Sequence, residues 1–169
     1  MRANKGHGHA GAMTSDLRFT RLDTLPEDFF AFCAESEAEG FRFLRRMQRE
    51  WAEGTNRFSE PGECLWGAFQ AGALVGCGGL NRDPYAGGAG AGRLRHLYVM
   101  RAARRQGIAS ALIGRLEASA RGHFALLRLR TDTEQAARFY LRHGYQPLAE
   151  ETASHVKWLA DPADQLFGK

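Results

Sequence analysis

The chain has 169 residues, a formal net charge of +4 and three cysteines. This length is typical of one compact domain, and no apolar run reaches the roughly 18 residues that a membrane-spanning helix needs. The small, evenly spread charge does not indicate a nucleic-acid-binding protein, so neither a membrane nor a nucleic acid is expected as a partner. The cysteines (Cys33, Cys64 and Cys77) are odd in number and lack CxxC spacing, which favours free thiols and a cytoplasmic location.

Residues 1–14 are rich in Gly, His and Ala and contain no apolar stretch. They are expected to form a disordered tail without a secretory signal, and residues 15–169 to form a single domain without repeats. His7 and His9 lie in this tail. A histidine pair in a glycine-rich tail is a weak indication of a metal site, and no metal is predicted.

The first half of the domain predicts one strand, two helices and a hairpin. A strand is expected over residues 17–22, and Thr24 followed by Pro26 is typical of a helix start, which predicts a helix over 26–35. Apolar residues at helical spacing predict a second helix over 40–51, ended by Gly54. Four arginines mark the solvent face of that helix: Arg42, Arg45, Arg46 and Arg49. Strands over 65–69 and 73–80 would form a hairpin around the QAGA turn.

The second half alternates strands and helices. A glycine-rich loop over 81–92 precedes a strand over 93–99, a basic turn and a helix over 107–121. A strand over 125–131, a helix over 134–143 and short strands over 145–148 and 155–159 complete the domain. The order β-α-α-β-β-β-α-β-α-β-β predicts a mixed α/β sheet, antiparallel first and parallel later.

The turn from Arg101 to Ala109 leads from a strand directly into an amphipathic helix. A helix N-terminus presents unpaired N–H groups and a partial positive charge, which together can bind a phosphate. Gly107 lets such a group approach the backbone closely. The alternative is a tight strand–helix turn with solvated arginines. A Walker loop is absent, because no GK[ST] follows.

Two motifs carry a resemblance to a known family. Residues 104–109 (RRQGIA) match the Q/R-x-x-G-x-G/A signature of the GCN5-related N-acetyltransferase (GNAT) superfamily. Residues 136–145 (AARFYLRHGY) are similar to its A-x-x-F-Y-x-x-x-G-F/Y helix end. The motifs occur in the family's order, with one strand between them. The resemblance implies a GNAT-like fold, with a central mixed, twisted sheet of six to seven strands flanked by about four helices.

The resemblance also implies a co-substrate, acetyl-CoA, and its binding residues. The backbone N–H groups of 105–109 would hold the pyrophosphate, and the pantetheine arm would pair with the strand at Tyr98 and Val99 like an added strand, at a splay between two parallel strands. Tyr140 would protonate the leaving thiolate, or it would only pack beside Phe139. The residues expected to contact acetyl-CoA are Tyr98, Val99, Arg104, Arg105, Gln106, Gly107, Ile108, Ala109 and Thr133.

The chain departs from the family pattern at two positions. Many members carry Asn seven residues before the tyrosine, where this chain has Thr133, which could contact the CoA arm or simply cap the helix. Many carry an acidic general base at the start of the fourth strand, where this chain has Arg93. The identity of the general base is therefore open.

Other polar residues have a functional and a structural interpretation. His96 could deprotonate an ammonium group, but a partly buried strand histidine is favoured. Asp83 and Tyr85 could contact the acceptor or be solvated loop residues. Arg128 and Arg130 could recognise an anionic substrate or occupy a wetted sheet face.

The expected function is transfer of an acetyl group from acetyl-CoA to a primary amine of a small molecule. The alternatives are a catalytically inactive acyl-CoA-binding module and an acetyltransferase acting on protein N-termini or lysines. Relatives often dimerise, so a homodimer is also an open alternative.

Overall fold

The computed structural model describes residues 16–87 and 90–159. They form one seven-stranded sheet in the order β1-β2-β3-β4-β5-β7-β6. The strands are β1 (Leu17–Arg21), β2 (Cys64–Gln70), β3 (Ala73–Arg82), β4 (Ala91–Val99), β5 (Leu126–Leu129), β6 (Gln146–Pro147) and β7 (His155–Trp158). The helices are α1 (Phe29–Ala38), α2 (Phe43–Glu53), α3 (Ile108–Ala120) and α4 (Glu134–Arg142), with a short 3₁₀ turn, η1 (Arg101–Ala103). The expected order of elements is confirmed.

The sheet is mixed, as expected, although parallel pairing is limited. β1 to β4 pair antiparallel, β4 and β5 pair parallel, and β5, β7 and β6 pair antiparallel again. The expectation of a parallel second half therefore holds for one strand pair only. The physical reason is that parallel neighbours need a crossover connection, and among the described elements only α3 provides one, between β4 and β5. The connection through α1 and α2 joins the antiparallel pair β1 and β2, and α4 leads to β6, which does not neighbour β5.

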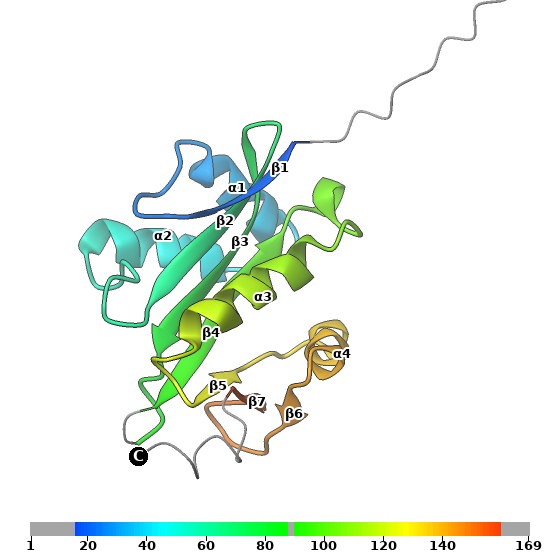
Figure 1. Ribbon diagram of the computed structural model, residues 1–169. Helices are drawn as coiled ribbons and strands as arrows, with labels where there is room; N and C mark the ends of the chain where they lie inside the picture. The colour runs from blue at the N-terminus through cyan, green and yellow to red at the C-terminus, as the bar shows by residue number, and fades with distance from the viewer. Residues whose placement is uncertain (1–15, 88–89, 160–169) are drawn as a thin grey trace, which may run out of the picture.

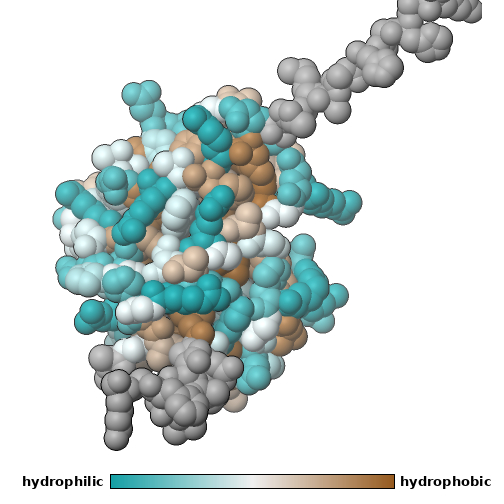
Figure 2. Space-filling model, in the orientation of Figure 1, coloured by the Kyte–Doolittle hydropathy of each residue, from teal (hydrophilic) through white to brown (hydrophobic). Residues whose placement is uncertain are grey.

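The helices cover the two faces of the sheet in pairs (Figure 1). On one face α1 and α2 pack through Phe29, Phe32 and Met47 onto Leu65 and Tyr98. On the other face α3 and α4 pack onto the leucines of β3, β4 and β5. Figure 2 shows the side of α3 and α4, where polar side chains cover most of the surface and apolar atoms are visible between them.

Several element boundaries differ from the sequence-based expectations by one to three residues: helix α2, for example, begins at Phe43 rather than near Gly40, and β5 ends at Leu129. Helix α1 begins at Phe29 rather than near Pro26, because residues 27–28 form a turn and the Asp28 carboxylate accepts a hydrogen bond from the N–H of Leu74 in β3 (2.9 Å). The glycine-rich loop is shorter than expected, because β3 continues to Arg82 and β4 begins at Ala91. Gly92 belongs to β4, where a Cβ would lie 2.8 Å from the side chain of Leu127.

Candidate active site

Strands β4 and β5 separate after three residue pairs. Their parallel pairing joins Ala91–Arg93 to Leu126–Arg128 only, while β4 continues to Val99. The N–H of Met100 donates to the carbonyl of Val75 in β3 (2.8 Å). Because backbone groups alternate in direction along a strand, those of Tyr98 face β3, and those of Leu97 and Val99 face the open side. The expected splay is present, and its open edge is formed by Leu97 and Val99 rather than by Tyr98.

A β-bulge interrupts β4 at the start of this open edge. Arg95 pairs with Gly79 and Tyr98 with Cys77, so His96 and Leu97 together oppose Gly78. His96 has a left-handed backbone conformation, with φ of 59°, which is uncommon outside glycine. The Cys77 thiol donates to the carbonyl oxygen of His96 (3.2 Å). Bulges of this kind bend a strand and redirect its side chains.

Beyond β4 the chain forms a concave turn of backbone N–H groups. Arg105 and Gly107 both have left-handed conformations, with φ of 65° and 75°. In the part of the chain that the structure describes, no N–H from residue 105 to residue 110 donates a hydrogen bond. Alternating right- and left-handed residues create such anion-binding concavities, and the N-terminus of α3 adds its partial charge. A Cβ on Gly107 would meet nothing within 4 Å, so the glycine is required by its φ and not by crowding.

The side chains of this turn are largely engaged by the protein itself. Arg104 donates to the Glu39 carboxylate (2.5 Å) and, through Nε, to the carbonyl of Val99 (3.0 Å). Arg101 lies 3.4 Å from the same carboxylate. The hydrogen bond from Arg104 lowers the pKa of Glu39. Glu39 therefore ties this turn to α1 and engages two of its arginines, whereas the backbone N–H groups of 105–110 stay free within the described residues.

Tyr98 and Gln106 are also held by protein partners. The Tyr98 hydroxyl donates to Glu39, and burial raises the pKa of that hydroxyl. Gln106 accepts a hydrogen bond from Gln70 (2.9 Å). The exposed side chain of Arg105 forms no ion pair within the described residues. Ile108 is buried in a core cluster with Ala68 of β2 and Ala103 of η1, which anchors the first turn of α3.

Tyr140 lies on α4 and is 8% exposed, packed beside Tyr145 and His155. Its hydroxyl forms no hydrogen bond with any residue that the structure describes. Burial raises the pKa of Tyr140, so the phenol stays protonated at neutral pH and can act as an acid. The packing interpretation and the acid interpretation of Tyr140 are thus compatible.

Thr133 is the N-cap of α4. Its Oγ1 accepts a hydrogen bond from the N–H of Ala136 (3.2 Å), which satisfies one free donor of the helix. The hydroxyl can still donate its proton to a ligand.

His96 is 8% exposed, and neither ring nitrogen has a hydrogen-bond partner within the described residues. The ring lies beside those of Phe43 and Phe58. Burial lowers the pKa of His96 to about 3, so the imidazole is neutral at pH 7 and is a weak base. These observations favour the buried strand histidine over the general base.

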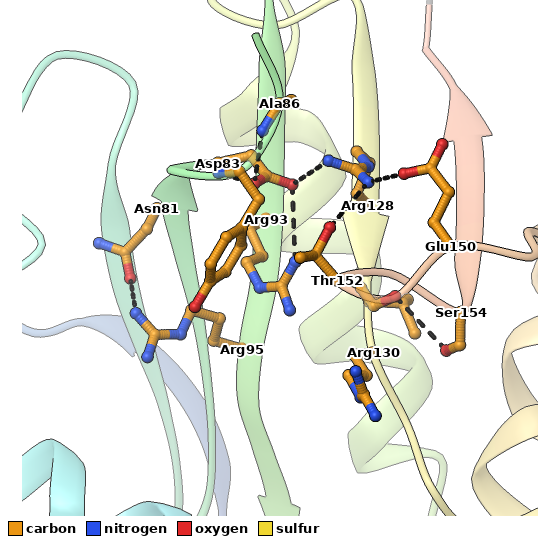
Figure 3. A network of polar contacts seen from close by, with 12 residues as sticks. Asn81, Asp83, Ala86, Arg93, Arg95, Arg128, Arg130, Glu150, Thr152 and Ser154 are labelled. Atoms are coloured by element: carbon orange, nitrogen blue, oxygen red, sulfur yellow. Dashed lines mark hydrogen bonds and ion pairs between the residues drawn. The ribbon is translucent and has the colours of Figure 1, made fainter.

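Asp83 is a buried structural carboxylate and not a solvated loop residue. Its Oδ1 accepts the N–H of Tyr85 (2.8 Å) and of Ala86 (3.2 Å), and its Oδ2 faces Arg128 at 3.3 Å and Arg93 at 3.6 Å (Figure 3). Tyr85 is exposed and covers Arg93 with its ring. Arg130 donates to the Glu151 carbonyl and remains half-exposed. The solvated-loop interpretation therefore applies to Tyr85 alone.

Sequence reasoning missed two residues of this region. Glu39, which links α1 to the turn after β4, has no local motif that could have identified it. Arg95 alternates with Leu94 on β4, as Arg128 does with Leu127 on β5. Because side chains alternate between the two faces of a strand, this alternation predicts that the arginines lie on one face of the sheet.

The helices found among residues 16–87 and 90–159 are all too short or too polar to cross a bilayer. Over the same residues, no three His, Cys, Asp or Glu side chains group in a way that could hold a metal ion. All three thiols are buried, and burial raises the pKa of Cys33 to about 11 and also raises that of Cys64 and Cys77.

Comparison with known proteins gives a consistent result. Residues 22–145 match the model of the Acetyltransferase (GNAT) family. A solved structure from Exiguobacterium sp. 255-15, which carries an acetyltransferase name, is 31% identical with a TM-score of 0.78, over 89% of this chain and 98% of that chain. A GCN5-related N-acetyltransferase from Ralstonia eutropha JMP134 is 26% identical with a TM-score of 0.59, over 80% and 96% of the two chains. No curated protein matches the chain.

Proposed function

Because the chain belongs to the acetyltransferase (GNAT) family, we propose that it transfers an acetyl group from acetyl-CoA to a primary amine of a small molecule by direct attack. The observation that carries this proposal is the pairing of two unsatisfied backbone features. One is the concave turn of free N–H groups over residues 105–110, and the other is the open strand edge at Leu97 and Val99.

The two features suit the two chemically distinct parts of acetyl-CoA. The pyrophosphate is an anion that free N–H groups and a helix N-terminus bind well. The pantetheine arm contains amides, which can pair with an unsatisfied strand edge like an added strand. Because Arg104 already occupies the carbonyl of Val99 (3.0 Å), this pairing would use the Val99 N–H and the groups of Leu97. An N–H of the open edge would also stabilise the oxyanion that forms when the thioester is attacked.

The reaction needs an acid for the departing sulfur. The amine nitrogen attacks the thioester carbonyl, the C–S bond breaks, and the Tyr140 hydroxyl gives its proton to the thiolate. The tyrosinate then regains a proton from the nitrogen, which was left with an extra one after the attack. Tyr140 suits this role because it is buried and protonated and its hydroxyl has no protein partner within the described residues.

The second candidate is an acyl-CoA-binding module without catalysis. It is favoured by one specific observation: the two residues at the expected base positions cannot take up a proton at neutral pH. Arg93 is a guanidinium, and the pKa of His96 is lowered to about 3. Under the leading proposal, the amine must therefore enter as the free base or lose its proton to water.

A titration of the protein with acetyl-CoA by calorimetry tests the proposal first, with dephospho-CoA and ATP as controls. We expect micromolar binding of acetyl-CoA and weak binding of ATP, followed by thiol release with members of a panel of primary amines. Binding without turnover on the whole panel would favour the non-catalytic module. A folded protein that does not bind acetyl-CoA would disprove both candidates.

A further inference from the structure

Three arginines lie on one face of β4 and β5: Arg93, Arg95 and Arg128; Arg130 directly follows β5. The leucines that alternate with them, Leu94, Leu127 and Leu129, pack into the core under α3 and α4. Because side chains alternate along a strand, the arginines face the opposite side, where α1 and α2 pack further along the sheet. This face is the continuation of the surface that holds Tyr98 and His96.

Arg128 is fully paired within the protein. It donates to Asp83 (3.3 Å) and to Glu150, and it lies 3.4 Å from the Thr152 hydroxyl (Figure 3). Its side chain is 8% exposed, and the Asp83 side chain is fully buried. Arg128 therefore belongs to a structural ion-pair chain from the end of β3 to the segment between β6 and β7, and it has little capacity for a ligand.

Arg93 and Arg95 are different, because their donors are hardly used. Within the described residues Arg93 donates no hydrogen bond, its Nη1 is buried without a partner, and its nearest carboxylate is the shared Asp83 at 3.6 Å. Arg95 makes one long contact, to Asn81 Oδ1 (3.4 Å), and no described carboxylate lies within 4 Å of it. Burial lowers the pKa of Arg95. Each guanidinium carries five N–H donors, and leaving such groups buried without partners is costly.

The position of this pair relates it to the proposed chemistry. Arg93 and Arg95 are two residues apart on β4, and Arg95 directly precedes the bulge and the open edge that begins at Leu97. Tyr140 approaches β4 and β5 from the opposite face of the sheet, in the core with Leu94 and Leu129. One face therefore holds the proposed acid. On the other face, Arg95 is two residues and Arg93 four residues from the start of the open edge at Leu97, or about 7 Å and about 13 Å along the strand.

We propose that Arg93 and Arg95 bind an anionic group, a carboxylate or a phosphate, on the acceptor amine. The inference rests on the proposed acetyltransferase function and specifies its substrate class. A planar guanidinium binds either anion with two parallel hydrogen bonds, which fixes orientation as well as position. The substrate is then a primary amine whose anionic group is separated from the nitrogen by a few bonds, so that anchoring the anion directs the nitrogen toward the open edge.

The test compares matched acceptors that differ only in the anionic group. Phenylalanine is paired with phenethylamine, β-alanine with ethylamine, and phosphoethanolamine with ethanolamine. For each acceptor, the appearance of the free CoA thiol from acetyl-CoA is followed. For at least one pair we expect the anionic member to have the higher kcat/KM, by roughly tenfold or more. The carboxylate pairs and the phosphate pair separate the two kinds of anion. Equal kcat/KM values within every pair would overturn the proposal.

Variants of Arg95 connect any preference to this residue. Arg95→Gln is expected to raise KM for the anionic member about tenfold, with KM for the neutral member and the Kd of acetyl-CoA unchanged, because it removes one charged partner of the anion. Arg95→Lys retains the charge but not the two parallel hydrogen bonds, so it should retain only part of the preference. Arg95→Met, which keeps an unbranched side chain without the charge, replaces Arg95→Gln if the latter does not fold. The matched control is Arg138→Gln, which removes an exposed arginine on α4 (63% exposed). Equal losses for both members of a pair would show a merely structural role and contradict the proposal.

A binding measurement separates this inference from the proposed function. N-acetylphenylalanine and N-acetylphenethylamine are titrated into the wild type and Arg95→Gln, in the presence of CoA, by ligand-observed NMR. Selective, Arg95-dependent binding of the carboxylate without any turnover would retain the anion site and reject catalysis. Turnover of neutral amines with no selective binding would retain catalysis and reject the anion site.

Discussion

The turn after β4 and the arginine-bearing face at the start of β4 are built in opposite ways. In the turn, most of the groups free for a ligand are backbone N–H groups, joined by the exposed side chain of Arg105, while Arg104 is held by Glu39. On the arginine face, the backbone is paired in the sheet, and the free groups are the side chains of Arg93 and Arg95. A site made of backbone tolerates many side chains but few changes of φ, whereas a site made of side chains depends on each residue. The backbone site of the turn therefore suits a ligand that many proteins share, and the side-chain site of the arginine face suits a ligand particular to this protein.

The largest expected effect concerns the structural support of the arginine face. Asp83→Asn removes the buried carboxylate shared by Arg93 and Arg128, and it should lower the free energy of unfolding by about 3 kcal/mol. The matched control is Asp132→Asn, because Asp132 is 86% exposed and pairs with Arg130 only at 3.7 Å. Chemical denaturation measures both, and the control should change by less than about 1 kcal/mol. A similar, small change in both variants would mean that the Asp83 pairs contribute little.

A change in the turn after β4 should abolish acetyl-CoA binding without a comparable loss of protein stability. Gly107→Glu places a side chain on a residue with φ of 75° and a negative charge beside the free N–H groups, so acetyl-CoA affinity should fall by more than about 100-fold. Gly114→Glu makes the same change on the exposed side of α3, where a Cβ meets nothing within 4 Å. Calorimetry should find normal affinity in that control. Normal affinity in a folded Gly107→Glu protein would remove the turn from the site.

A variant of Tyr140 tests the proposed acid, which acts on the thiolate of the bound acetyl-CoA. Tyr140→Phe should lower kcat by about 100-fold, as loss of a general acid does, with little change in acetyl-CoA affinity or stability, because its hydroxyl has no described protein partner to lose. Tyr145→Phe is the opposite case, since its buried hydroxyl donates to Glu117 (3.0 Å). That variant should lose stability and keep its kcat. An unchanged kcat in Tyr140→Phe, with chemistry rate-limiting, would exclude Tyr140 as the acid.

His96 lies between the two regions and should make the protein sensitive to acid. The unfolded chain protonates this histidine near pH 6.5, whereas burial lowers its pKa in the folded state to about 3. Between these values the unfolded state binds more protons, so stability falls as the pH is lowered, by roughly 2 kcal/mol at pH 5. His96→Asn tolerates the left-handed backbone and does not titrate, so it should remove most of this slope. The free energy of unfolding is measured from pH 7 to pH 5 for the wild type and for His96→Asn. If it falls equally with pH in both proteins, His96 is not the group that causes the acid sensitivity.

Sequence reasoning succeeded where the relevant information is local. The order of elements follows from periodicity and turn residues, and Gly107 with its flanking residues marks the N-terminus of α3. It failed where distant segments meet. Nothing near Glu39 indicates that it will hold Arg104, and Asp83 resembles a loop residue until Arg93 and Arg128 are placed beside it. The alternation of arginines with leucines on β4 and β5 was visible, but whether an arginine is paired depends on the three-dimensional arrangement.

The early separation of β4 from β5 also bears on aggregation. An unpaired strand edge normally offers a template on which another polypeptide can add, and proteins often protect such edges with charges or bulges. Here the free edge of Leu97 and Val99 belongs to β4, an interior strand of the sheet, with a bulge at its start. β5 ends at Leu129, one residue beyond its last pair with β4, so the open stretch is a short interruption of pairing inside the sheet and not an outer edge. A short, bulged stretch of this kind is a poorer template for an added protein strand than a long outer edge.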